Sequence, residues 1–198
     1  MSNKSGDCLS LFVLNATSLA KPNAVQLLST ELLQLRSHCG LISESWLTSK
    51  HESAVVAIKG YDLYRRDRCK GRGDGVCAYV RNDVTCSIYC PAALLTANRP
   101  DVIEIMWLKC FFDSRHYYIA CCYNPPRHLY RDSQFVGLLT SDLEYINSIC
   151  CDAVVIVAGD FNQLDTSFLE QEQGLVQMVT VSTPVSYTHL TLPTILRV

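Results

Sequence analysis

Six side chains that can bind a cation or a phosphate stand where apolar segments of this sequence end. They are Asn15 after "LFVL", Glu44 after "GLIS", Tyr123 and Asn124 after "IACC", and Asp160 and Asn162 after "VVIVAG". In α/β proteins, binding sites gather at the carboxyl ends of strands, so we expect these side chains to meet in one cleft. Mg²⁺ takes one or two carboxylates and keeps several bound waters. The set therefore indicates metal-assisted hydrolysis of a phosphate ester.

The two carboxylates of this set suit different roles. Glu44 is the expected ligand of Mg²⁺, because a carboxylate with amides and waters is the coordination that a hard divalent ion takes. Asp160 can then orient or deprotonate the attacking water. The remaining polar groups, on Asn15, Asn162 and Tyr123, can donate hydrogen bonds to phosphate oxygens.

The segment "DAVVIVAGDFNQLD" admits two interpretations at its polar end. The unbroken apolar run before Gly159 indicates a strand that is covered on both faces. If the chain stays extended past Gly159, Asp160 and Asn162 point to one side, and Phe161 anchors the other. Alternatively, Gly-Asp-Phe-Asn is only a turn, because Gly, Asp and Asn are the residues that turns favour.

Strand-like and helix-like segments alternate along the chain and would position these ends. Apolar residues at helical spacing predict helices over residues 23–37 and 132–148. Strands joined by helices, together with strands joined directly, predict a layered α/β sandwich with mixed β-sheets. The sequence has no internal repeat and no linker, so we expect one domain. The predicted strands are residues 9–14, 40–43, 76–80, 102–108, 117–122 and 153–158.

The composition narrows the class of partner. The 198 residues are 48% hydrophobic and 18% charged, which suits one globular domain with a core. A net charge of -2 gives no overall basic signature, so contact with nucleic acid must come from a local patch. The segment "YRRDRCKGRGDG", residues 64–75, is such a patch. Its arginines suit DNA phosphates as part of a Gly-rich loop, or form a solvated face with Asp67 as partner. They are Arg65, Arg66 and Arg68.

Cysteine usage favours a reducing, intracellular compartment. The 11 cysteines include the adjacent pairs Cys121-Cys122 and Cys150-Cys151, but no CxxC and no His/Cys ladder, so we expect no zinc site. Their number is odd and the pairs lie in apolar runs, which favours reduced thiols. The apolar run of residues 8–20 is too short and too interrupted for a signal peptide. No segment approaches the roughly 18 apolar residues of a membrane span.

Five motifs occur in an order that points to a known family. They are "LNATSLAKPNAVQLL", "LISESWLTSKHE", "GYDLYRRDRCKGRGDGVCAYVRND", "YNPP" and "VIVAGDFN", and they fall within a matching stretch of about residues 9–180. In these motifs the chain resembles the endonuclease/exonuclease/phosphatase superfamily, whose members have the DNase I-like fold. It is most similar to the endonuclease domain that heads the polyproteins of non-LTR retrotransposons.

The resemblance implies a role for each matching residue. The family holds its metal through a Glu in a motif like "SESWL" and through an N-terminal Asn. It faces the phosphate with a Tyr and carries an Asp and Asn pair after a strand. The basic patch and the Asn after the Tyr are further candidates for contact with DNA. The assignment is therefore Tyr123, Asp160 and Asn162 for catalysis, Glu44 and Asn15 for the metal, and Arg66 and Asn124 for substrate binding.

The resemblance also implies a cofactor and partners. In relatives of this type the enzyme nicks a chromosomal strand, and the freed 3′-hydroxyl primes reverse transcription by a downstream domain of the same polyprotein. We therefore expect Mg²⁺, or Mn²⁺ in its place, as cofactor. We expect DNA and a downstream reverse transcriptase domain as partners, and action in the nucleus. A phosphatase of the same superfamily and a non-catalytic nucleic-acid-binding remnant are the alternative functions.

Two motifs of the family are absent from this chain, namely a later Asp within an "LD" strand and a closing Ser-Asp-His. The segment "VSYTHLTLPT" resembles the translation of a sequencing-library adaptor. We therefore interpret residues 185–198 as a non-native tail and residues 1–184 as a partial endonuclease domain that is incomplete at its C-terminus. His189 is accordingly not the missing catalytic His. We expect the fragment to be inactive as it stands.

Overall fold

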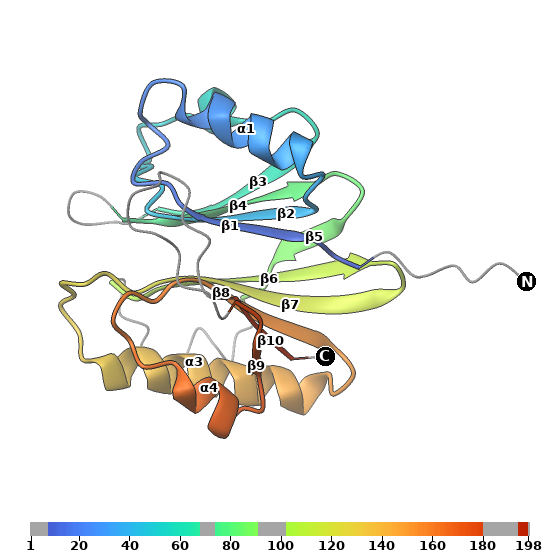
Figure 1. Ribbon diagram of the computed structural model, residues 1–198, viewed down its shortest axis with the longest axis vertical. Coiled ribbons are helices and arrows are strands. Elements are labelled where there is room, and N and C mark those ends of the chain that lie inside the picture. Colours follow the sequence, from blue (N-terminus) through green and yellow to red (C-terminus); the bar gives the residue numbers. More distant parts are fainter. Residues whose placement is uncertain (1–7, 68–73, 91–101, 180–193, 198) are drawn as a thin grey trace, which may run out of the picture.

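Two mixed β-sheets lie face to face in the computed structural model of this chain, which describes residues 8–67, 74–90, 102–179 and 194–197 (Figure 1). The first sheet has the order β1 (Leu11–Asn15), β2 (Cys39–Ser43), β4 (Val76–Arg81) and β3 (Tyr61–Arg66). The second has the order β5 (Thr85–Ile88), β6 (Glu104–Phe112), β7 (Arg115–Tyr123), β8 (Val154–Asp160), β10 (Thr194–Arg197) and β9 (Val176–Gln177). Strands β1 and β2 run parallel, as do β7 and β8, whereas the other pairs are antiparallel.

Helices cover the outer faces of the two sheets (Figure 1). Helix α1 (Ala24–Gln34) and the 3₁₀ helix η1 (Ser53–Val56) pack on the first sheet. Helices α3 (Asp132–Ile149) and α4 (Ser167–Gln171) pack on the second. The predicted α/β sandwich with mixed sheets is confirmed. No helix in the described part of the chain has the length and apolar character needed to cross a bilayer.

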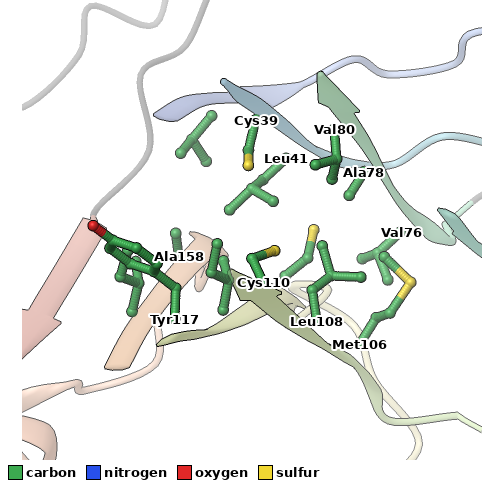
Figure 2. Packing of buried hydrophobic residues seen from close by; sticks show 14 of the residues in the cluster. Cys39, Leu41, Val76, Ala78, Val80, Met106, Leu108, Cys110, Tyr117 and Ala158 are labelled. Carbon is green, nitrogen blue, oxygen red and sulfur yellow. The ribbon is translucent and has the colours of Figure 1, made fainter. Parts of the chain in front are cut away.

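The core between the sheets follows from the two-residue period of the strands. In β7, Ile119 and Cys121 face the first sheet, whereas Tyr118, Ala120 and Cys122 face helix α3. Every strand in the middle of the sandwich is therefore buried on both faces, as its unbroken apolar sequence predicts. Figure 2 shows the inner cluster, in which residues from both sheets interdigitate. Its labelled members include Leu41, Val76, Ala78, Met106, Leu108 and Ala158.

Strand β3 replaces part of the Gly-rich loop that was expected over residues 64–75. It pairs with β4 along its whole length, so Arg65 and Arg66 belong to a β-strand. The loop interpretation is wrong for these two residues. Arg68 lies outside the described residues. The apolar signal of β3 is weak because its residues are half-buried rather than buried, and pairing with β4 decides its structure.

Strand β10 falls within residues 185–198, the range that the sequence assigns to a non-native tail. It pairs antiparallel with β8, with Ile195 opposite Val157 and Leu196 opposite Ile156. The described part of that range therefore extends the second sheet beyond β8. The division into a partial domain and a non-native tail stays a prediction.

Candidate functional site

The core between the sheets ends in polar side chains along one edge. In β1 the core residue Val13 is followed two positions later by Asn15. In β8 the core residue Ala158 is followed in the same way by Asp160. Tyr123, the last residue of β7, belongs to the core cluster itself. Because alternate residues of a strand share a face, these three side chains all point between the two sheets.

The carboxamide of Asn15 joins the two carboxylates of the site. Its Nδ2 donates to Oε1 of Glu44 at 2.8 Å and to Oδ2 of Asp160 at 2.7 Å. Its Oδ1 accepts from the amide of Thr17 at 3.0 Å, which fixes the orientation of the carboxamide. The hydroxyl of Tyr123 donates to the same Glu44 oxygen at 2.9 Å. The structure thus brings Asn15, Glu44, Tyr123 and Asp160 together, as the strand ends predict.

Glu44 reaches this cluster through an unusual backbone conformation. It follows directly after β2 with a φ of 51°, and Trp46 has a φ of 54°. Such left-handed conformations cost a non-glycine residue about 1–3 kcal/mol and persist where neighbouring contacts impose them. The segment leading into β4 supplies those contacts: the amide of Ser45 donates to the carbonyl of Gly75 at 3.0 Å, and that of Trp46 to the carbonyl of Asp74 at 2.8 Å.

The chain turns directly after Asp160 and does not continue as a strand. Asn162 has a φ of 48°, and its amide donates to Oδ1 of Asp160 at 3.0 Å, which closes an Asx turn. The side chain of Asn162 donates to the carbonyl of Asn124 at 2.8 Å. Extension through Asn162 is therefore wrong, and the turn interpretation is correct at this residue. Phe161 is 2% exposed and anchors the turn in the core beside α3.

Gly159 allows β8 to approach β7 closely at the site. Its φ is 143°, and a Cβ atom there would lie 1.9 Å from the carbonyl oxygen of Cys122. Only glycine fits this position. The close approach sets Tyr123 beside Asp160, which are partners in the parallel register of β7 and β8.

Burial dominates the electrostatics of the site. It raises the pKa of Asp160 above the usual value, and the negative charge of Glu44 adds to the shift. Hydrogen bonds from Asn15 and from the amide of Asn162 oppose it. Burial, followed by the hydrogen bond to Glu44, raises the pKa of Tyr123 well above its usual range. Tyr123 therefore stays a neutral hydroxyl donor.

Glu104 is a site neighbour that the sequence analysis missed. It is 2% exposed, faces Tyr123 across β6 and β7, and accepts from the amide of Gly75 at 2.8 Å. Through Gly75 it supports the segment that holds Ser45, next to Glu44. The sequence does carry a signal for Glu104. It is an acidic residue at the start of a strand, on the same face as the core residue Met106, and a charge at such a position needs a partner.

The arginines of β3 match one part of their expected surroundings, because Arg65 has Asp67 as its partner, but Arg65 does not form a solvated face. Arg65 forms an ion pair with Asp67 at 2.7 Å and donates to the carbonyls of Thr48 and His51. It therefore ties a loop to the first sheet and does not present its guanidinium to solvent. Arg66 donates to the carbonyl of Ile105, which lies in β6 of the other sheet. Its assignment to substrate binding stays a prediction.

Asn124 connects the end of β7 to the turn that follows Asp160. It is 2% exposed, its amide donates to the carbonyl of Asp160 at 2.8 Å, and its Nδ2 donates to the carbonyl of Phe161 at 3.4 Å. Its Oδ1 accepts from the hydroxyl of Tyr130 at 2.8 Å. The side chain thus fixes the chain after β7 to the turn after β8. The predicted contact of Asn124 with substrate is not tested by these bonds.

The donor set fits a hard divalent cation. Within the described residues, no three His, Cys, Asp or Glu side chains gather as a metal-binding group. Glu44 and Asp160 nevertheless share one hydrogen-bond donor, so their charges are close enough to serve one cation. Two carboxylates with waters satisfy Mg²⁺. Asn15 turns its N–H group toward the carboxylates, and it would have to rotate its carboxamide to offer an oxygen to the metal.

Comparison with known proteins identifies the fold. The sequence matches no protein-family model and no curated protein. The structure is similar to the endonuclease domain of TRAS1, a telomere-specific non-LTR retrotransposon, with a TM-score of 0.63 and 14% identity over 93% of this chain and 82% of that one. It is similar to D. rerio TDP2 complexed with single-strand DNA product, with a TM-score of 0.60 and 17% identity over 96% and 83%. The human Nocturnin catalytic domain with bound sulfate matches with a TM-score of 0.63 and 16% identity over 95% and 81%. The DNase I-like fold is thus confirmed.

Proposed function

We propose that this site hydrolyses phosphodiester bonds of DNA with Mg²⁺, or with Mn²⁺ in its place, as the endonuclease of a non-LTR retrotransposon. The observation that carries the proposal is the side-chain NH₂ group of Asn15, which donates to both Glu44 and Asp160 and so joins the two sheets. The shared fold with a retrotransposon endonuclease domain and with a DNA-bound protein supports it. The order of the five sequence motifs supports it independently.

The side chains divide the chemistry among themselves. Glu44 and Asp160 would hold the cation, which supplies positive charge to the phosphate and lowers the pKa of bound water. Asp160, held by Asn15 and by the Asx turn, accepts the proton of the attacking water. Tyr123 keeps its proton and would donate a hydrogen bond to a phosphate oxygen once the substrate displaces its bond to Glu44. Asn162 lies exposed beside this group and can donate to the same phosphate.

The chain as it stands lacks the closing Asp and Ser-Asp-His residues of the family. We therefore expect residues 1–198 to bind the cation and DNA but to be inactive. In a polyprotein that continues past residue 184, a reverse transcriptase domain would extend the freed 3′-hydroxyl, and the cut would be made in nuclear DNA.

Binding of Mg²⁺ by the 198-residue chain is the first test. Thermal melting with and without millimolar Mg²⁺ should show a rise in Tm, because a ligand of the folded state stabilises it by mass action. The matched variant is Glu44→Gln, which keeps the acceptor for Asn15 and Tyr123 but removes one charge. It should fold normally and lose the Mg²⁺-dependent rise. An equal rise in both proteins would remove Glu44 from the metal site.

Nicking of supercoiled plasmid is the second test, made with a protein that continues through residue 184 into the sequence of its own genomic locus. This protein should nick the plasmid with Mg²⁺ and not with EDTA. Glu44→Gln and Asp160→Ala should each lower the rate by a factor of about 100 or more, the scale for groups that act in the transition state. Equal nicking by all three proteins would contradict the proposal. Faster release of phosphate from a monoester than from plasmid would favour a phosphatase.

A further inference from the structure

The loop between β7 and α3, residues 125–131, is pinned at both ends by its own side chains. Tyr130 is 8% exposed and donates its hydroxyl to Asn124 at the root of the loop. The ring of His128 stacks on Tyr130 with a centroid distance of 4.4 Å. Its Nδ1 lies 2.8 Å from the carbonyl of Pro125, and its Nε2 lies 3.0 Å from a carboxylate oxygen of Asp132, the first residue of α3. We call residues 125–131 the pinned loop.

The pinned loop turns an apolar side chain outward. Leu129 is 87% exposed, more than any other large hydrophobic residue that the structure describes. Its neighbours in sequence, His128 and Tyr130, are held against the protein, so Leu129 cannot fold inward without breaking their contacts. Arg127 and Arg131 are exposed on either side of it. The loop therefore presents a leucine between two cations.

The pinned loop is built onto the candidate site. Asn124, which anchors Tyr130, also accepts from the side chain of Asn162 and donates its amide to the carbonyl of Asp160. Figure 1 shows the loop leaving the end of β7, at the left edge of the view, before the chain enters α3. A polymer whose phosphate lies at Asp160 would therefore extend past this loop.

We infer that the pinned loop is a duplex-DNA contact in which Leu129 enters the base stack while Arg127 and Arg131 meet the flanking phosphates. The inference rests on the proposed function and specifies how that site takes its substrate. Apolar side chains inserted between base steps unstack and kink duplex DNA, and arginines beside them supply the charge that holds the backbone. A kink beside the candidate site would present one strand to the carboxylates.

A protein partner fits the same loop less well. A stable protein interface buries on the order of 800 Å² on each side, whereas one leucine flanked by two arginines offers a small apolar area. The flanking charges match a polyanion, and the adjoining carboxylates belong to a site proposed to cleave one. The observations therefore favour duplex DNA as the partner of the pinned loop.

The test measures DNA binding by the 198-residue chain and does not depend on cleavage. A short duplex carrying 2-aminopurine is titrated with protein in Ca²⁺, and anisotropy reports binding while 2-aminopurine fluorescence reports unstacking. Leu129→Ser should weaken duplex binding about tenfold, the scale for returning one leucine to water, and abolish the fluorescence rise. Leu129→Phe should retain both. Leu33→Ser is the matched control, because Leu33 is 57% exposed on α1, on the outer face of the other sheet.

Three outcomes would overturn the inference: equal binding and fluorescence for Leu129→Ser and the unaltered chain, equal loss in the Leu33→Ser control, or no binding of the duplex by any of them. Weaker binding of Leu129→Ser without any fluorescence rise in the unaltered chain would also overturn it, because Leu129 would then not enter the stack. Leu129-dependent unstacking supports the inference even if the plasmid test fails. Failure of the loop and failure of the proposed chemistry can therefore be told apart.

Discussion

The carboxamide of Asn15 organises the charge of the site. Burial and the nearby negative charge of Glu44 both favour the protonated form of Asp160. The NH₂ group of Asn15 donates one hydrogen bond to each carboxylate, which reduces the cost of the charged form of Asp160 without adding charge. Thr17 holds that group in place through its own amide. The site is thus arranged for negative charge before any cation binds.

The first prediction concerns the titration of Asp160 in Mg²⁺-free buffer. Its folded pKa lies above the unfolded value of about 4, so the fold favours the protonated carboxyl. Its contribution to the free energy of unfolding is therefore present below the unfolded pKa and is lost as the pH rises through the folded pKa. Glu44→Gln should lower the Asp160 pKa, because the Glu44 charge raises it. Carboxyl ¹³C NMR titrations of both proteins measure this, and identical Asp160 curves would contradict it.

At the residue scale, strand ends could be predicted from the sequence and backbone turns could not. Asn15, Tyr123 and Asp160 lie together because each continues the inner face of a core strand, which the apolar pattern specifies. Glu44 reaches them by a left-handed conformation that no local pattern demands. Glu104 was missed because it contacts the distant amide of Gly75, and sequence spacing does not encode that approach.

The junction of β7 and β8 is the element on which the site depends most. Gly159→Ala would place a methyl group against the carbonyl oxygen of Cys122, 1.9 Å away. We expect a loss of about 3 kcal/mol or more in the free energy of unfolding, because backbone must move and the φ of 143° is strained for alanine.

Gly137→Ala is the matched control for this prediction. Gly137 lies exposed in α3, where an added Cβ meets nothing within 4 Å, so alanine should stabilise by up to about 1 kcal/mol. Urea unfolding of both variants tests the pair. A Gly159→Ala protein as stable as the unaltered chain would show that β8 can shift without cost.

The hairpin of β3 and β4 gives a second prediction for an element. Arg65 is 12% exposed in its side chain and joins β3 to the loop at Thr48 and His51. Arg65→Met should lower the free energy of unfolding by about 1–3 kcal/mol, because the part-buried carbonyls of Thr48 and His51 lose their donor. The salt dependence of DNA binding should not change, since the guanidinium is engaged within the fold. If the DNA affinity of Arg65→Met depends less on salt concentration than that of the unaltered chain, Arg65 contacts DNA and this prediction is wrong.

Elements with a clear apolar pattern were predictable, whereas β3 and β5 were not. Helix α3 and strand β8 match their expected ranges within one or two residues, because α3 repeats apolar residues at helical spacing and β8 is a short unbroken apolar run. Strand β5 is mostly exposed, and strand β3 is mostly half-buried. Their structure comes from pairing with β6 and β4, which the local sequence does not reveal.

At the scale of the whole molecule, the site lies between the two sheets and takes residues from both. Asn15 and Glu44 belong to the first sheet and the segment after it, whereas Tyr123 and Asp160 belong to the second. Addition of Mg²⁺ should therefore slow amide hydrogen exchange at the ends of β1 and β8 together. Glu44→Gln should show no such protection. Slowing confined to one sheet would contradict a shared cation.

The small side chains of the inner core, among them Ala78 and Ala158 in Figure 2, hold the sheets at their present separation. A bulkier residue there would widen the sandwich and lengthen the 2.7 Å contact of Asn15 with Asp160, which joins the two sheets. The size of the side chains in the inner core would therefore affect the rate of the proposed cleavage. If the proposed nuclease activity is put under directed evolution, beneficial changes should arise in the interior as readily as at the surface proposed to contact DNA.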